Sequence, residues 1–301
     1  MNNEYSLKKV AIILLLGVAL IGIPLTVYLG QRQQETRSRA AVTPEDGVVV
    51  VIDGIEYTKA QVRKIAEEYN DPSVVDTQSL NVALQILEER KILDKAQKDL
   101  GIQVDSSKLN TLVQAGFSQE DARYEVLKDQ VILKVVRSRR AISIRFWNPP
   151  SSSLSSLTAE ERTAAANELR DGTAALGEAE TRLRAGEDIF EIADSLLVKY
   201  PSLVPVLGVN GYILSGMDEL EKLEAKLPPT YEIGDSNLDK ETLDTLFAMQ
   251  VNEVSSVINT EANRGGTVFK LLTIGNNNGL GSYEIWLSGQ IASLVKIVNP
   301  L

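Results

Sequence analysis

Two residue types that carry much of enzyme chemistry are missing from this sequence: it contains no cysteine and no histidine. Their absence excludes thiolate nucleophiles, Ser-His-Asp triads and the usual zinc ligand sets, and it removes the side chain best suited to proton transfer near neutral pH. No disulfide can hold the fold. A mechanism built on carboxylates alone remains open, because Asp and Glu together number 41.

Positive charge is also scarce, with 31 Lys and Arg residues and a formal net charge of -10. Nucleic-acid affinity rests largely on cations that neutralise phosphates, so we expect no nucleic-acid partner. The acidic residues are spread over expected helix faces, and the sequence has no EF-hand loop, P-loop or Gly-rich dinucleotide turn. We therefore predict neither a metal site nor a cofactor.

One long hydrophobic run is present at residues 10–30, VAIILLLGVALIGIPLTVYLG, and it carries no charge. At about 1.5 Å per residue it is long enough to cross a hydrocarbon layer of about 30 Å. A cleaved signal peptide has a shorter apolar region of about 7–15 residues. We predict an uncleaved signal anchor over residues 1–30, with cleavage as the alternative.

The orientation of this segment is less clear, because basic residues flank it on both sides. The short N-terminal tail and the long downstream part favour a cytoplasmic N-terminus and a body on the extracytoplasmic side. Residues 31–46 are polar and are predicted to be a tether.

Residues 48–69 predict a β-hairpin that leads directly into a helix. Asp53-Gly54 is a favoured two-residue hairpin turn between β-branched runs. Thr58 and Gln61 have the spacing of a capping box, and apolar residues then recur with helical periodicity. Further helices are predicted from Leu80 to about Gly101, after Asp105, and from Ser118.

At this point the sequence resembles a known family. VIDGIEYTKAQV, followed by LNVALQILEERKILDKAQKDLGIQVDSSKL and ARYEVLKDQVILKVV, is similar to the N-terminal domain of SurA/PrsA-type chaperones, which carry parvulin-like prolyl isomerase domains. The resemblance implies a mostly helical chaperone domain over residues 47–141.

The region 142–275 resembles a parvulin-like (PpiC-type) domain in outline. LRAGEDIFEIADSL, VLGVNGYIL and LFAMQVNEVSSVINTEANRGGTVFKLLTI are similar to the family's helix, glycine-containing strand and C-terminal end, and ISIRFW is expected to supply the first strand. Thr158 and Glu161 predict the cap of a new helix after the Pro/Ser linker at 148–156. The closing segment 276–301 resembles the family's C-terminal part, which implies that it packs back on the first domain with Trp286 buried.

The expected activity depends on the positions at which this sequence differs from the family's pattern. The resemblance associates parvulins with two His residues, but the C-terminal His position falls at Thr267 here and the first-strand His has no counterpart in ISIRFW. Rotation about a peptide bond has a barrier of about 18–20 kcal/mol, which an isomerase lowers by desolvation and positioned groups. We predict that the isomerase activity is lost or weak, and we name no catalytic residue.

Four residues are candidates for an apolar peptide-binding pocket: Tyr212, Met217, Phe247 and Met249. Ordinary core packing is the alternative reading for each of them.

The sequence thus predicts an α+β protein with an N-terminal transmembrane helix, a SurA-N-like domain completed by the C-terminal segment, and a parvulin-like domain. The leading hypothesis is a membrane-anchored extracytoplasmic folding factor whose partners are unfolded or newly exported polypeptides. An active prolyl isomerase and a cell-surface scaffold are the alternatives.

Overall fold

The computed structural model describes residues 44–146, 158–235, 238–260 and 265–301, and these form a mixed α+β structure with antiparallel sheets. The α+β class is therefore confirmed. No helix in these ranges is long and apolar enough to span a membrane, and the anchor expected at 10–30 lies outside them, as does the linker at 148–156. The chain divides into two compact units, one ending at Asp94 and resuming at Glu284–Leu301, the other comprising Lys95–Tyr283.

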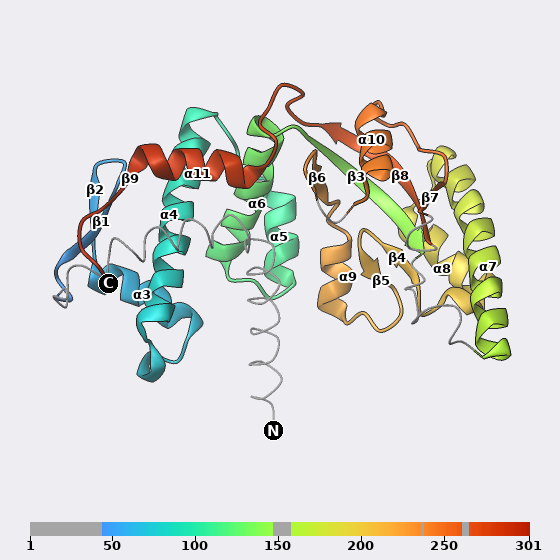
Figure 1. Ribbon diagram of the computed structural model, residues 1–301, viewed down its shortest axis with the longest axis horizontal. Helices are drawn as coiled ribbons and strands as arrows, with labels where there is room; N and C mark the ends of the chain where they lie inside the picture. The colour runs from blue at the N-terminus through green and yellow to red at the C-terminus, as the bar shows by residue number, and fades with distance from the viewer. Residues whose placement is uncertain (1–43, 147–157, 236–237, 261–264) are drawn as a thin grey trace. The chain divides into compact units, whose positions relative to one another are not determined.

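The first unit contains a three-stranded sheet in the order β2-β1-β9 (Figure 1). Strands β1 (Val48–Ile52) and β2 (Ile55–Thr58) are joined by Asp53 and Gly54, whose φ angles of 50° and 79° fit the predicted hairpin turn. Strand β9 (Val295–Ile297) pairs with the other side of β1 in antiparallel register. The sheet is therefore completed by residues from the end of the chain.

Helices cover this small sheet. Helix α3 (Lys59–Tyr69) begins with the predicted capping box of Thr58 and Gln61, and the short η1 (Pro72–Val74) leads to α4 (Thr77–Asp99). A buried apolar core joins the sheet to both helices; its members include Val50, Ile52, Val62, Leu80 and Leu84. Helix α11 (Tyr283–Leu294) precedes β9, and the expected burial of Trp286 is confirmed.

The helices of the second unit include α5 (Ser106–Gln114), α6 (Gln119–Val135) and α9 (Glu219–Ala225). Ser118 caps α6 as its sequence suggested. Leu112 and Val126 share a core with the half-buried Leu227, which follows α9. The division between the two units falls inside α4. Within the second unit, α5 packs on α9, and α6 packs on β3 and β6.

The larger sheet has the strand order β5-β4-β3-β8-β7, and β6 pairs with the first part of β3. Its long central strands are β3 (Ser138–Phe146) and β8 (Gly265–Ile274). The shorter strands are β4 (Leu207–Val209), β5 (Tyr212–Ile213), β6 (Thr230–Glu232) and β7 (Ile258–Thr260). The segment expected to supply the first strand lies in β3, and VLGVNGYIL forms the β4–β5 hairpin, with Asn210 and Gly211 at positive φ.

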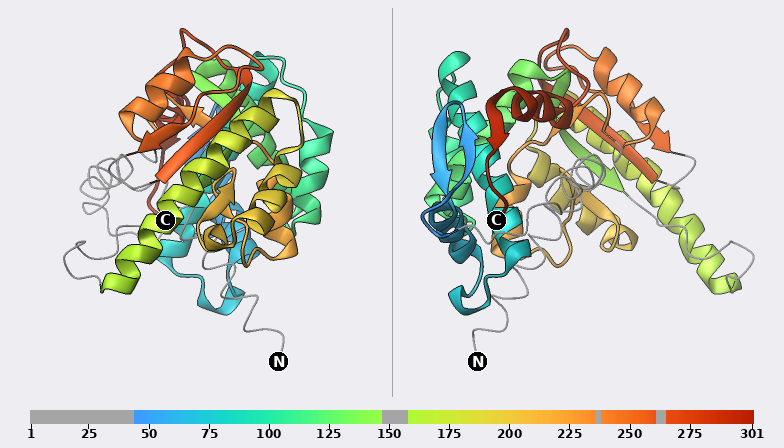
Figure 2. Two further views of the ribbon diagram at one scale, coloured as in Figure 1. Left: turned by 90° about the vertical axis from the view of Figure 1, so that its right-hand side faces the viewer. Right: turned by 60° about the vertical axis from the view of Figure 1, so that its left-hand side comes forward.

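Helices lie against both faces of this sheet. Helices α7 (Ala159–Arg184), with its predicted Thr158 cap, and α8 (Ile189–Lys199) pack on the face that carries Ile144, Phe146 and Val268, here called the α7 face. Figure 2 (left) shows α7 running alongside β8. A Cβ atom on Gly172 of α7 would lie 2.7 Å from the Phe146 ring, so glycine permits this close packing. The short η3 (Pro201–Leu203) follows α8.

Helix α10 (Lys240–Ala248) belongs to the opposite face, which carries Ala141, Phe269 and Leu271 and is here called the α10 face. Leu246 of α10 and Met249 just after it join that core. Of the residues that the sequence analysis singled out, Thr267 and Met249 lie on this face.

Candidate functional site

Strand register decides which residues accompany Thr267 on the α10 face. Thr267 lies opposite Arg145 of β3 on one side and Ile258 of β7 on the other, and Arg145 in turn lies opposite Gly208 of β4. Residues directly opposite each other in a sheet project from the same face. A half-buried arginine therefore lies beside Thr267, the residue that the sequence resemblance aligned with a family histidine. Sequence reasoning missed Arg145, because the register of β3 against β8 cannot be read from either strand alone.

Side chains fill the α10 face around Thr267. Thr267 is only 5% exposed, Met249 is 4% exposed and Phe269 is 1% exposed. The Tyr231 ring meets Phe269 edge-on, with 5.6 Å between ring centroids. Burial raises the pKa of Tyr231, and its hydrogen bond with Ser143 lowers that pKa by less. The α10 face around Thr267 is therefore closely packed, and Met249 is one of the buried residues of its core.

Tyr212 lies at the edge of the same sheet, and Met217 lies outside the sheet. Tyr212 is in the edge strand β5, with β4 and β3 between it and β8, and Met217 follows in the loop before α9. The Tyr212 hydroxyl donates to a carboxylate oxygen of Glu224 over 3.1 Å. Burial, followed by the charge of Glu224, raises the pKa of Tyr212 to about 12. The four predicted pocket residues therefore fall into two groups, Tyr212 with Met217 and Phe247 with Met249.

Phe247 belongs to a cluster with two arginines, Arg137 and Arg139, which we call the Arg–Phe cluster. The Cζ atoms of Arg139 and Arg137 lie 4.8 Å and 5.7 Å from the centroid of the Phe247 ring. Arg139 donates through Nη1 to the Ser138 carbonyl over 2.9 Å and through Nη2 to the Phe247 carbonyl over 3.1 Å. Arg139 is 4% exposed, and its buried Nε has no hydrogen-bond partner among the residues that the structure describes.

The surroundings of Arg139 make its charged form less favourable than it is in water. Burial lowers the pKa of its guanidinium, and the positive charge of Arg137 lowers it further. The group still stays protonated at neutral pH, since arginine does not lose its proton in proteins. Sequence reasoning missed this cluster, because Arg137 and Arg139 lie in a part of the chain that was assigned to the helical domain, and β3 begins only at Ser138.

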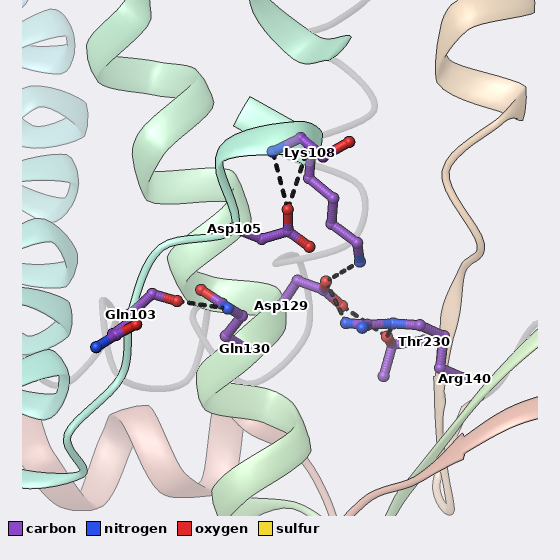
Figure 3. Close-up of polar contacts among 8 residues, drawn as sticks. Gln103, Asp105, Lys108, Asp129, Gln130, Arg140 and Thr230 are labelled. Carbon is purple, nitrogen blue, oxygen red and sulfur yellow. Dashed lines mark hydrogen bonds and ion pairs between the residues drawn. The ribbon is translucent and has the colours of Figure 1, made fainter. Parts of the chain in front are cut away.

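The next residue, Arg140, projects from the other side of β3 into a network with Asp129, Lys108 and Thr230, here called the Asp129 network (Figure 3). The Asp129 carboxylate pairs with the Arg140 guanidinium and accepts from Lys108 Nζ over 2.8 Å. Thr230 Oγ1 donates to Asp129 over 2.6 Å and accepts from Arg140 Nε over 3.2 Å. The network thereby joins α5, α6, β3 and β6.

The pKa of Asp129 reflects this pairing. Burial acts to raise the pKa of the carboxyl, but the hydrogen bond and charge of Arg140, together with those of Lys108, outweigh it and hold the pKa below its ordinary value. The charged form of Asp129 is therefore the form that the fold favours.

Comparison with known proteins finds likeness only among solved structures. No family model matches the chain, and no curated protein matches it. The foldase PrsA of Streptococcus pneumoniae aligns with 82% of this chain and 85% of its own, at 15% identity and a TM-score of 0.27. PrsA of Bacillus subtilis aligns with 83% and 85% of the two chains, at 14% identity and a TM-score of 0.24.

A SurA-like chaperone of Campylobacter jejuni aligns with 82% of this chain and 88% of its own, at 13% identity and a TM-score of 0.22. At these identities and TM-scores the alignments assign no family, no activity and no partner to this chain.

Proposed function

We propose that this protein is an extracytoplasmic folding factor, anchored in a membrane through residues 10–30, that binds unfolded or newly exported polypeptides without catalysing proline isomerisation efficiently. The observation that carries the proposal is the burial of the α10 face: Thr267, which the sequence resemblance aligns with a family histidine, is 5% exposed, and the side chains of Met249 and Phe269 are buried on the same face. A proline ring would have to displace them. Polypeptide binding needs no such pocket.

The β5 edge is the part of the second unit best suited to hold an extended chain. In the described part of the chain it is the last strand of its sheet, and edge strands present backbone groups that can pair with an incoming strand. Ile213 in this strand is 40% exposed and the nearby Val204 is 41% exposed. Tyr212 and Met217 are half-buried there, and methionine adapts its shape to varied apolar partners. Such contacts favour weak binding of many sequences.

The test combines two assays on the full chain, kept in solution with a mild detergent. One follows aggregation of a reduced, unfolded client, and the other follows cis-trans exchange of an Xaa-Pro tetrapeptide by NMR. We expect aggregation to be suppressed and exchange to stay at its uncatalysed rate. Ile213→Ser should weaken the suppression, whereas Val198→Ser, at a position 82% exposed on α8, should not.

Other results would redirect the proposal. Accelerated exchange that disappears in Phe247→Ala would identify a working isomerase that needs no histidine. Inactivity in both assays would contradict a folding role and favour a scaffold.

A further inference from the structure

The Arg–Phe cluster carries more positive charge than its contacts neutralise. Arg137 and Arg139 each bear a full charge. The Phe247 carbonyl that accepts from Arg139 lies at the C-terminal end of α10, and a helix C-terminus is equivalent to about half an elementary negative charge. The ring face of Phe247 adds only its quadrupole. In these contacts, the two positive charges of the guanidinium groups are therefore offset by only about half an elementary negative charge.

No carboxylate in the described part of the chain pairs with either arginine of the cluster; carbonyl oxygens and the aromatic ring are their contacts there. This contrasts with Arg140, which has Asp129. A buried cation without a counter-ion is costly to the fold, and the two guanidinium groups also repel each other. An anion placed beside Arg137 would relieve both effects.

We propose that the Arg–Phe cluster binds carboxylate groups of client polypeptides, so that acidic residues next to apolar ones are preferred. This inference rests on the proposed polypeptide-binding function and adds a class of ligand to it. A carboxylate matches the planar fork of a guanidinium, which can donate two parallel hydrogen bonds to it.

The surroundings of the cluster fit such a ligand. Arg137 is exposed, so its donors are accessible, while the buried Arg139 lies near the same Phe247 ring and contributes its field. Phe247 and Ile233 are both half-buried, and the Ile233 amide donates to the Arg137 carbonyl, which places an apolar residue at the base of Arg137. An apolar side chain next to the acidic one can therefore contact Phe247 or Ile233.

The experiment measures binding of two fluorescein-labelled, C-terminally amidated twelve-residue peptides of alternating leucine and acid or amide. One contains Glu and the other contains Gln at the same positions. The full chain should bind the Glu peptide about tenfold more tightly, as expected for a charge-assisted hydrogen-bonded pair. Arg137→Gln should abolish this preference and leave the Gln peptide's affinity unchanged. Arg162→Gln, which removes an exposed charge on α7, should keep the preference.

The outcomes separate this inference from the proposed function. Equal binding of both peptides by the unaltered chain would overturn carboxylate recognition and leave polypeptide binding intact. No binding of either peptide would contradict polypeptide binding itself, and carboxylate recognition with it. A preference that survives Arg137→Gln, or that Arg162→Gln abolishes equally, would show that overall charge selects the peptide and would reject the cluster as the site.

Discussion

Arg139 and Arg140 are consecutive residues of one strand, yet their surroundings are opposite in kind. Arg140 meets a carboxylate, a lysine that shares this carboxylate, and a hydroxyl in the Asp129 network. Arg139 meets two carbonyl oxygens and an aromatic ring, with one nitrogen unpartnered. The first arrangement holds elements together, whereas the second leaves positive charge unmatched. The difference distinguishes a structural ion cluster from a candidate binding site.

The largest expected effect comes from removing the shared anion of the Asp129 network. Asp129→Asn leaves Lys108 and Arg140, which are 17% and 13% exposed, without their carboxylate. We expect the free energy of unfolding to fall by about 3 kcal/mol, as for other broken buried pairs. Urea unfolding followed by circular dichroism measures it. Asp244→Asn, which removes an exposed partner of Lys240, is the control and should have almost no effect.

Acidification should reproduce that loss. Because the folded pKa of Asp129 is lower than the unfolded one, its stabilising contribution is present above the unfolded pKa and disappears as the pH falls through the folded value. The unfolded pKa of an aspartate is about 3.9, so the stability difference between the unaltered chain and Asp129→Asn should be constant at pH 5–7 and shrink below about pH 4. A difference that does not change with pH would contradict the assigned charge state.

Replacing each of the two neighbouring arginines by methionine compares the regions directly. Arg140→Met should lower the free energy of unfolding by about 2 kcal/mol, since it deprives Asp129 of one cation. Arg139→Met should change it by no more than about 1 kcal/mol, because the lost carbonyl contacts are offset by removal of an uncompensated buried charge. The free energies of unfolding of the two variants, measured by urea denaturation, test this difference. Equal losses would mean that Arg139 is as structural as Arg140.

The smallest expected effect concerns the aromatic ring. Phe247→Leu removes the ring from Arg137 and Arg139 and should cost about 1 kcal/mol of stability, while Phe247→Tyr, which keeps a ring, should cost less. Thermal or urea unfolding of the two variants tests this order. An equal loss in both would indicate that packing of Phe247, and not its contact with the arginines, is what matters.

Much of the local structure was predictable from the sequence because its determinants are close together in the chain. The hairpin turn at Asp53-Gly54 and the capping boxes of Thr58 and Thr158 occur where the sequence places them. The candidate site was less predictable. Thr267 was identified through a family resemblance, and Phe247 through its residue type, but neither observation contained their partners Arg145, Arg137 and Arg139.

By itself the sequence determined the hairpins, the helix starts, the absence of histidine and cysteine chemistry, and the α+β class, since turn residues, caps and apolar periodicity act over a few positions. The tertiary structure alone decided that β9 pairs with β1, that Arg145 lies opposite Thr267, and that Arg140 pairs with Asp129 whereas Arg139 contacts carbonyl oxygens and Phe247. These outcomes depend on strand register. A shift of one residue would exchange the two faces, and only packing of residues far apart in the chain selects between the alternatives.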